Sequence, residues 1–149
     1  AYPGIQYRIP VAVQGGAYPF HYQVVSGPSG MTVGATVWDQ NYGTVTWTPA
    51  STGGPFNVVV RVTDQQGATA NVTFSVTATT QGFVFINPSA PAGGTGSLNS
   101  PLRSFADLWK GTTTDRTYAG AVLYLRGGTH ALSGLAGNNG NVNLVADNK

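Results

Sequence analysis

The chain has 149 residues, of which 41% are hydrophobic and only 8% are charged, and its formal net charge is +2. This balance argues against an intrinsically disordered chain, which requires high charge and few apolar residues. The Lys and Arg residues are scattered, whereas a nucleic-acid groove needs a clustered cationic face, so we expect no nucleic-acid partner. No apolar stretch reaches the roughly 20 residues that cross a bilayer, and we expect no membrane insertion.

Short strands separated by turns are predicted along the first part of the chain. Val, Thr and Tyr, which favour strands, are frequent there, and Gly, Pro and Asn mark the turns. We expect the first four strands at residues 5–13, 20–26, 35–39 and 43–49.

Two longer strands follow, at residues 56–64 and 68–78, joined by the turn sequence DQQG. Apolar and polar residues alternate along both strands, so one side of each should face a core. The residues on the predicted core side are Phe56, Val58, Val60, Val62, Ala70, Val72, Phe74 and Val76. Strands of this number and spacing predict a β-sandwich.

The run SGPSGMTVGATVWDQNYGTVTWTP, followed by FNVVVRVTDQQGATANVTFSVTA, resembles the immunoglobulin-like, cadherin-like repeats of bacterial and phage surface proteins. Residues 26–78 carry the signature of these repeats, including GMT, TWTP and VRVTD. The resemblance implies an extracellular spacer or binding module, usually without a catalytic site. The Cys…Trp…Cys core of antibody domains is absent, because the chain has no cysteine.

The pattern changes after a short polar junction at residues 79–82. GFVFINP predicts a brief strand, and a loop of small residues leads into SPLRSFADLWKG, which predicts a helix. Ser100 suits the helix N-cap, Pro101 suits the first helical position, and Gly111 can end the helix. The predicted helix has one apolar face, formed by Leu102, Phe105, Leu108 and Trp109.

Two similar apolar strands, centred on Leu123 and Leu144, follow at about the spacing of one solenoid turn. The paired segments GGTGSLNSPLRSFA and LYLRGGTHAL resemble the N-terminal region of pectate-lyase-like, right-handed parallel β-helix proteins. The resemblance implies that the helix is a structural cap over the first coil. A phosphate-binding role for the glycine turn is not supported, because neither the third glycine of Gly-x-Gly-x-x-Gly nor a P-loop lysine is present.

The predicted fold class is therefore all-β with two domains. Residues 1–80 form an Ig-like β-sandwich, and residues 81–149 form the capping helix and first coils of a parallel β-helix. A coil stack of about two repeats is too short to bury its own core, so we expect this β-helix to be incomplete.

Three kinds of site residue are candidates. Trp38 and Tyr42 flank a polar loop and could offer aromatic faces to a sugar, although core packing is the competing interpretation. Asp64 is a weak calcium candidate, because a calcium site needs several converging carboxylates and the chain has five acidic residues in all. Asn71 begins an Asn-Val-Thr sequon and is a possible glycosylation site.

We expect a non-catalytic module of the cell surface or of a phage virion, as in an adhesin or tail fibre. No cofactor is expected apart from possible calcium, and the expected partner is a polysaccharide or cell-surface glycan. Two alternatives remain open. The chain could be the N-terminal part of a polysaccharide lyase or glycoside hydrolase, although no catalytic carboxylate pair is evident. It could also be a self-assembling fibre subunit, which would form homo-oligomers.

Overall fold

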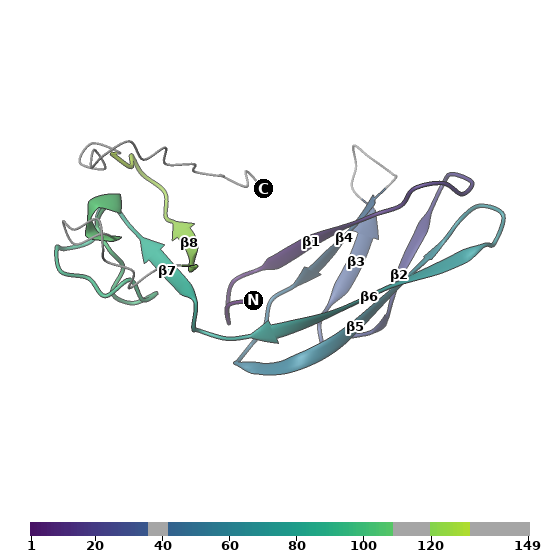
Figure 1. The fold of residues 1–149 in the computed structure, drawn as a ribbon, viewed down its shortest axis with the longest axis horizontal. Helices are drawn as coiled ribbons and strands as arrows, with labels where there is room; N and C mark the ends of the chain where they lie inside the picture. Colours follow the sequence, from purple (N-terminus) through teal and green to yellow (C-terminus); the bar gives the residue numbers. More distant parts are fainter. Residues whose placement is uncertain (36–41, 109–119, 132–149) are drawn as a thin grey trace. The chain divides into compact units, whose positions relative to one another are not determined.

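The computed structural model describes residues 1–35, 42–108 and 120–131 (Figure 1). The chain divides into two compact units, Ala1–Thr80 and Gln81–Lys149. In the described residues both units are built from strands with almost no helix, which confirms the all-β prediction.

The first unit consists of two antiparallel three-stranded sheets (Figure 1). One sheet has the order β1-β4-β3, from β1 (Tyr7–Ala12), β4 (Tyr42–Trp47) and β3 (Thr32–Ala35). The other has the order β2-β5-β6, from β2 (His21–Ser26), β5 (Gly53–Thr63) and β6 (Thr69–Ala78). This arrangement is the predicted sandwich.

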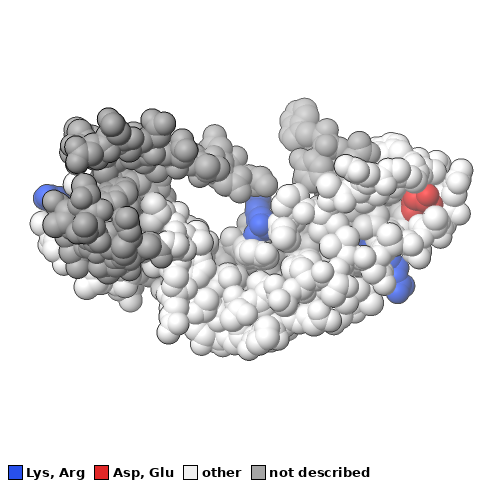
Figure 2. All heavy atoms as spheres, in the orientation of Figure 1, with Lys and Arg blue, Asp and Glu red and all other residues white. Residues whose placement is uncertain are grey.

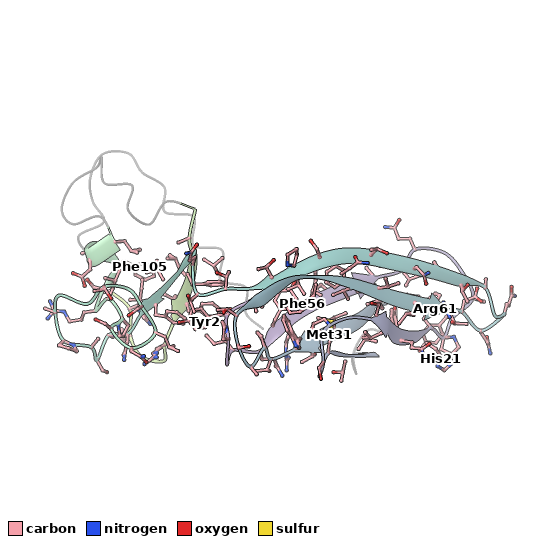
Figure 3. The ribbon with its side chains drawn as sticks, turned by 90° about the horizontal axis from the view of Figure 1, so that it is seen from below. Tyr2, His21, Met31, Phe56, Arg61 and Phe105 are labelled. Carbon is pink, nitrogen blue, oxygen red and sulfur yellow. The ribbon has the colours of Figure 1, made fainter. Side chains whose placement is uncertain are left out.

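Alternate residues of the strands fill the space between the two sheets. Val45, Val58 and Val60 are completely buried there, and Met31 and Phe56 lie among the same core side chains (Figure 3). Trp47 packs edge-on against Phe56, with ring centroids 5.6 Å apart, and its Nε1 donates a hydrogen bond to Ser29 O. The alternation predicted along β5 is therefore confirmed.

One strand prediction is only partly tested and another needs correction. A strand begins earlier than expected, at Thr32–Ala35, and residues 36–39 of the strand expected at residues 35–39 lie outside the described part of the chain. On β6, the predicted core residues Ala70 and Val72 are exposed, while Phe74 is half-buried and Val76 is buried. Alternation defines the side of a strand but not whether an opposing sheet extends over it, and here the opposing sheet leaves this end of β6 uncovered.

Gly43 allows the two sheets to approach closely. A Cβ atom at this position would lie 2.6 Å from Cδ1 and 2.7 Å from Cγ of Tyr22, a half-buried residue of the opposing sheet. Real Cβ atoms do not come this close, so a side chain here would force the Tyr22 ring or the strand to move.

We predict that Gly43→Ala destabilises the sandwich by about 1–3 kcal/mol, the usual cost of overpacking a core. Gly34→Ala is the matched control, because Gly34 is also a strand glycine of the same sheet but a Cβ there would meet nothing within 4 Å. Urea unfolding of both variants measures the difference. Equal stabilities for the two variants would contradict the close contact.

The second unit contains a parallel pair of strands, β7 (Phe83–Ile86) and β8 (Val122–Leu125), in which Val84 is opposite Leu123. The other edge of β7 is occupied by residues 96–102. Phe85 N donates to Gly96 O at 2.8 Å, and Leu102 N donates to Phe85 O at 2.9 Å. The core of this unit is small and combines β7 with the segment that follows it: Val84, Ile86, Leu102, Phe105 and Leu108.

The predicted helix begins later than expected, which corrects the roles of Ser100 and Pro101. The observed helix is the 3-10 helix η1 (Phe105–Leu108), and Trp109 lies outside the described residues. Ser100 closes the preceding glycine turn instead, because its carbonyl accepts from Thr95 N and Gly96 N, both at 2.9 Å.

The start of η1 is fixed by Ser104 and Asp107. Oδ2 of Asp107 accepts hydrogen bonds from Ser104 N at 2.9 Å, from Ser104 Oγ at 3.1 Å and from Arg103 N at 3.1 Å. A carboxylate three residues after an N-cap serine that reaches back to the serine N–H is one half of a capping box. Leu102 cannot join the helix, because its backbone is paired with β7.

The parallel register can be tested with cysteine pairs, since the chain has no native cysteine. Adjacent strands lie about 4.8 Å apart, within the Cα separation that a disulfide tolerates. We expect Val84→Cys with Leu123→Cys to oxidise readily, because these residues are register partners. Val84→Cys with Leu125→Cys, displaced by two residues along the strand, is the control and should stay reduced. Equal oxidation of both pairs, measured by thiol titration, would contradict the register.

Candidate functional site

One end of the sandwich brings together the β1–β2 loop, residues 13–20, and the β5–β6 turn, residues 64–68 (Figure 1). Two short contacts join them at Ala17. Gln65 N donates to Ala17 O at 2.8 Å, and Ala17 N donates to Oδ2 of Asp64 at 3.0 Å. The loop is therefore held to the turn on both sides of one residue.

The Asp64 carboxylate organises this end of the sandwich. Besides the bond from Ala17, its Oδ1 accepts from Gln66 N at 3.0 Å and from Ala68 N at 2.9 Å. The bond from Ala17 is the largest cause of a lowered pKa for Asp64; desolvation opposes it, and the other amides of the turn add to the lowering. Backbone N–H groups stabilise the charged form, so Asp64 is an anionic clamp between loop and turn.

Tyr18, the neighbour of Ala17, is the prominent exposed aromatic residue of this loop. Its side chain is 49% exposed, and its ring packs edge-on against the buried Phe20, with centroids 6.2 Å apart and an interplanar angle of 81°. The hydrogen bond from Ala17 N to Asp64 fixes the backbone next to Tyr18. The result is an aromatic ring that faces solvent from an ordered loop, which we call the Tyr18 platform.

Comparison with protein families matches residues 1–79, slightly more than half of the chain, to the family described as "Putative Ig domain". The chain belongs to this family. No curated protein and no solved structure matches the chain. An Ig-like domain is typical of structural or adhesive modules.

The two predicted sugar-contact residues of this Ig-like domain are only partly located. Trp38 lies outside the described residues. The backbone of Tyr42 pairs with Ala12, the last residue of β1, and so lies at the strand end from which the Tyr18 loop departs. Trp47 belongs to the core. Sequence patterns did not single out Tyr18; the available signal was an aromatic residue in the glycine-rich turn GGAYP.

The calcium and glycosylation candidates occupy ordinary structural positions. Both carboxylate oxygens of Asp64 accept backbone hydrogen bonds, and no group of three His, Cys, Asp or Glu residues gathers in the part of the chain that the structure describes. Asn71 is exposed on β6, where Nε of Arg61 lies 3.5 Å from its Oδ1. Calcium binding and glycosylation both stay predictions.

The face of the molecule in Figure 2 carries only isolated charged patches among its described residues. The described residues also contain no helix that is long and apolar enough to cross a membrane.

Of the six predicted cap residues, three meet in one cluster. Leu102, Phe105 and Leu108 are buried together against Val84 and Ile86 of β7. Ser100 and Pro101 lie in the turn before them, and Trp109 is not among the described residues. The cluster was predicted as a helix face but forms from a bridged residue and a 3-10 turn.

We predict that Asp64→Asn lowers the melting temperature at pH 7, because an amide nitrogen replaces one of the two accepting oxygens. The folded-state pKa is lowered, so the stabilisation by the carboxylate is present above the ordinary aspartate pKa of about 3.9 and is lost as the pH falls through the folded-state value. The difference between the wild-type protein and the variant should therefore shrink below about pH 4. Thermal unfolding from pH 2 to 8 measures it, and a pH-independent difference would contradict this role.

Proposed function

We propose that the chain is a structural and adhesive module of an extracellular surface, that of a cell or a virion. The Ig-like domain acts as a spacer that contacts glycans through its loop end and carries the beginning of a right-handed parallel β-helix. The observation on which the glycan contact rests is the Tyr18 platform, an exposed aromatic ring on a loop fixed by Asp64.

The chemistry of the loop end suits a carbohydrate. Sugar rings present flat C–H faces that pack on exposed aromatic rings, while polar groups nearby hydrogen-bond the hydroxyls. A ring that is already fixed loses little conformational freedom on binding. The predicted sugar contacts Trp38 and Tyr42 belong to the same proposal. Tyr42 pairs with Ala12, the last residue of β1, after which the loop that carries Tyr18 begins.

The β-helix part of the proposal rests on the layering of the second unit. Residues 96–102 occupy one edge of β7, and β8 occupies the other in parallel. The end of β8 is tied back to the covering segment, because Nη2 of Arg126 donates to Leu98 O at 2.9 Å. A covered first strand followed by a parallel second strand is the arrangement expected at the start of a coil stack.

The apolar residues of β8 support further stacking. By register, Leu123 and Leu125 are opposite Val84 and Ile86, both of which are buried in the core of this unit. Leu123 and Leu125 are nevertheless 36% and 47% exposed. In a coil stack these positions face the interior and would be covered by the next coil.

The glycan contact can be tested with the whole chain on a panel of immobilised acidic and neutral polysaccharides. We expect Tyr18→Ala to weaken retention about five-fold, corresponding to about 1 kcal/mol for one aromatic contact. Val25→Ala is the matched control, because Val25 is 46% exposed but lies on β2. The proposed contact would be contradicted if no polysaccharide retained the chain, or if the Tyr18→Ala and Val25→Ala variants were retained equally.

The same incubations separate the spacer from the enzymatic alternative. Under the proposal, the chain leaves the polysaccharides intact. New reducing ends or unsaturated sugars, assayed after incubation, would overturn the proposal in favour of a polysaccharide lyase or glycoside hydrolase.

A further inference from the structure

The longest edge strand of the sandwich is also its least protected. β6 runs over Thr69–Ala78 with the sequence TANVTFSVTA, which contains no charged residue and no proline. Its pairing with β5 is regular from Thr63↔Thr69 to Phe56↔Val76. Strands with these properties pair readily with another strand when an edge is open.

The other three edges of the sandwich carry features that hinder such pairing. β1 contains Arg8 and Pro10, β2 has a register shift between Val24 and Ser26, and β3 has only four residues. Charge, proline, bulges and short length are the usual ways in which edge strands are kept from pairing with other molecules. β6 has none of these features, so among the described strands of the sandwich its edge is the least hindered for strand addition.

The N-terminal residue shows which backbone groups of β6 face that edge. Ala1 N donates to Thr77 O at 2.8 Å, and Thr79 N donates to Ala1 O at 2.9 Å. Because hydrogen-bonding direction alternates along a strand, residues of the same parity direct their N–H and C=O groups to the same side. These residues are Thr69, Asn71, Thr73 and Ser75, and no described strand pairs with them.

The side chains at this end of β6 are exposed on both faces of the sheet. Asn71 and Thr73 lie on the polar outer face, and Ala70 and Val72 are exposed on the side that elsewhere faces the core. Val72 is 37% exposed. A strand added to β6 would therefore gain both backbone hydrogen bonds and apolar contacts.

We propose that the β6 edge is a homodimer interface, in which β6 of a second copy pairs with it in antiparallel orientation about Val72. In the described part of the chain no strand pairs with the outer edge of residues 69–75, and Val72 is the midpoint of this segment. A two-fold axis at Val72 places Thr69 opposite Ser75 and Asn71 opposite Thr73 of the other copy. It also places Ala70 opposite Phe74, and Val72 opposite itself.

This register is self-complementary, which favours a second copy as the occupant. Polar residues meet polar residues on the outer face, and apolar residues meet apolar residues on the other. No charge on either strand is buried or repelled. The edge-facing residues Thr69, Asn71, Thr73 and Ser75 pair only with one another, so all their N–H and C=O groups find partners. The two sheets β2-β5-β6 then join into one continuous sheet.

A single introduced cysteine tests the register in the full chain, which has no native cysteine. With Val72→Cys, the two cysteines lie opposite each other in a non-hydrogen-bonded pair, with Cα atoms about 4.5 Å apart, close enough for a disulfide. With the control Ala70→Cys, each cysteine is four residues from its counterpart, about 13 Å away, and cannot bridge. We expect a dimer on a non-reducing gel for the first variant only. Equal cross-linking of both variants, or of neither, would overturn the proposal.

Sedimentation velocity over a concentration series tests the interface without cross-linking. We expect the wild-type chain to form dimers, and Val72→Lys to raise the dimer dissociation constant about ten-fold or more, because like charges meet at the two-fold axis. Thr73→Pro should act similarly, since it removes an N–H that faces the open edge rather than β5, whereas Thr73→Ala should not. Asn57→Lys adds the same charge on the central strand β5 and should leave the dimer intact.

Thermal unfolding confirms that each variant is folded before its association is compared. A strictly monomeric wild-type chain would refute the proposal. So would a dimer that resists Val72→Lys and Thr73→Pro but is lost with Leu125→Lys, because the open strand β8 would then be the interface. The outcome of this test is independent of the proposed glycan contact, because that contact involves neither Val72 nor Thr73.

Discussion

Every open β-sheet has two edges whose outward N–H and C=O groups must pair with another group or face water. Both units of this chain respond to that constraint. In the Ig-like domain, Ala1 occupies the end of the β6 edge, and proline, charge, a bulge or short length marks the other edges. In the second unit, residues 96–102 occupy one edge of β7 while β8 occupies the other. The edges of β6 and β8 carry no partner strand among the described residues, so these two edges are available for pairing with other strands.

The loop end of the sandwich depends on one carboxylate. Asp64 satisfies three backbone N–H groups that would otherwise be left at a turn, and one of them belongs to the loop that carries Tyr18. The same bonds that lower its pKa also fix the loop, so the electrostatics and the geometry of this end have a single origin. A ring whose backbone is already held loses less conformational freedom on binding, and Ala17, the residue held by Asp64, is the immediate neighbour of Tyr18.

Local patterns in the sequence predicted what depends on near neighbours. The alternation of Val58, Val60 and Val62 was sufficient to predict the core side of β5, because these side chains pack in one core with residues of the opposing sheet. The same alternation failed at Ala70 and Val72, where burial depends on how far the opposing sheet extends. Ser100 and Ser104 are equally good N-cap residues, and the choice between them is made by the pairing of Leu102 with β7, a contact distant in sequence. The exposure of Tyr18 likewise depends on how two loops meet.

The parallel pairing of β7 and β8 explains why a covering segment lies between them in the sequence. Parallel neighbours cannot be joined by a tight turn, so the chain after Ile86 must travel back to the start of the next strand before Val122 can pair with Phe83. Part of that connection, residues 96–108, packs against β7 on its way: Leu102 bridges Ile86, and Phe105 and Leu108 complete the core. A connection required by topology therefore also supplies the cover of the first strand. Among the described residues this cover lies along β7, on the edge opposite β8.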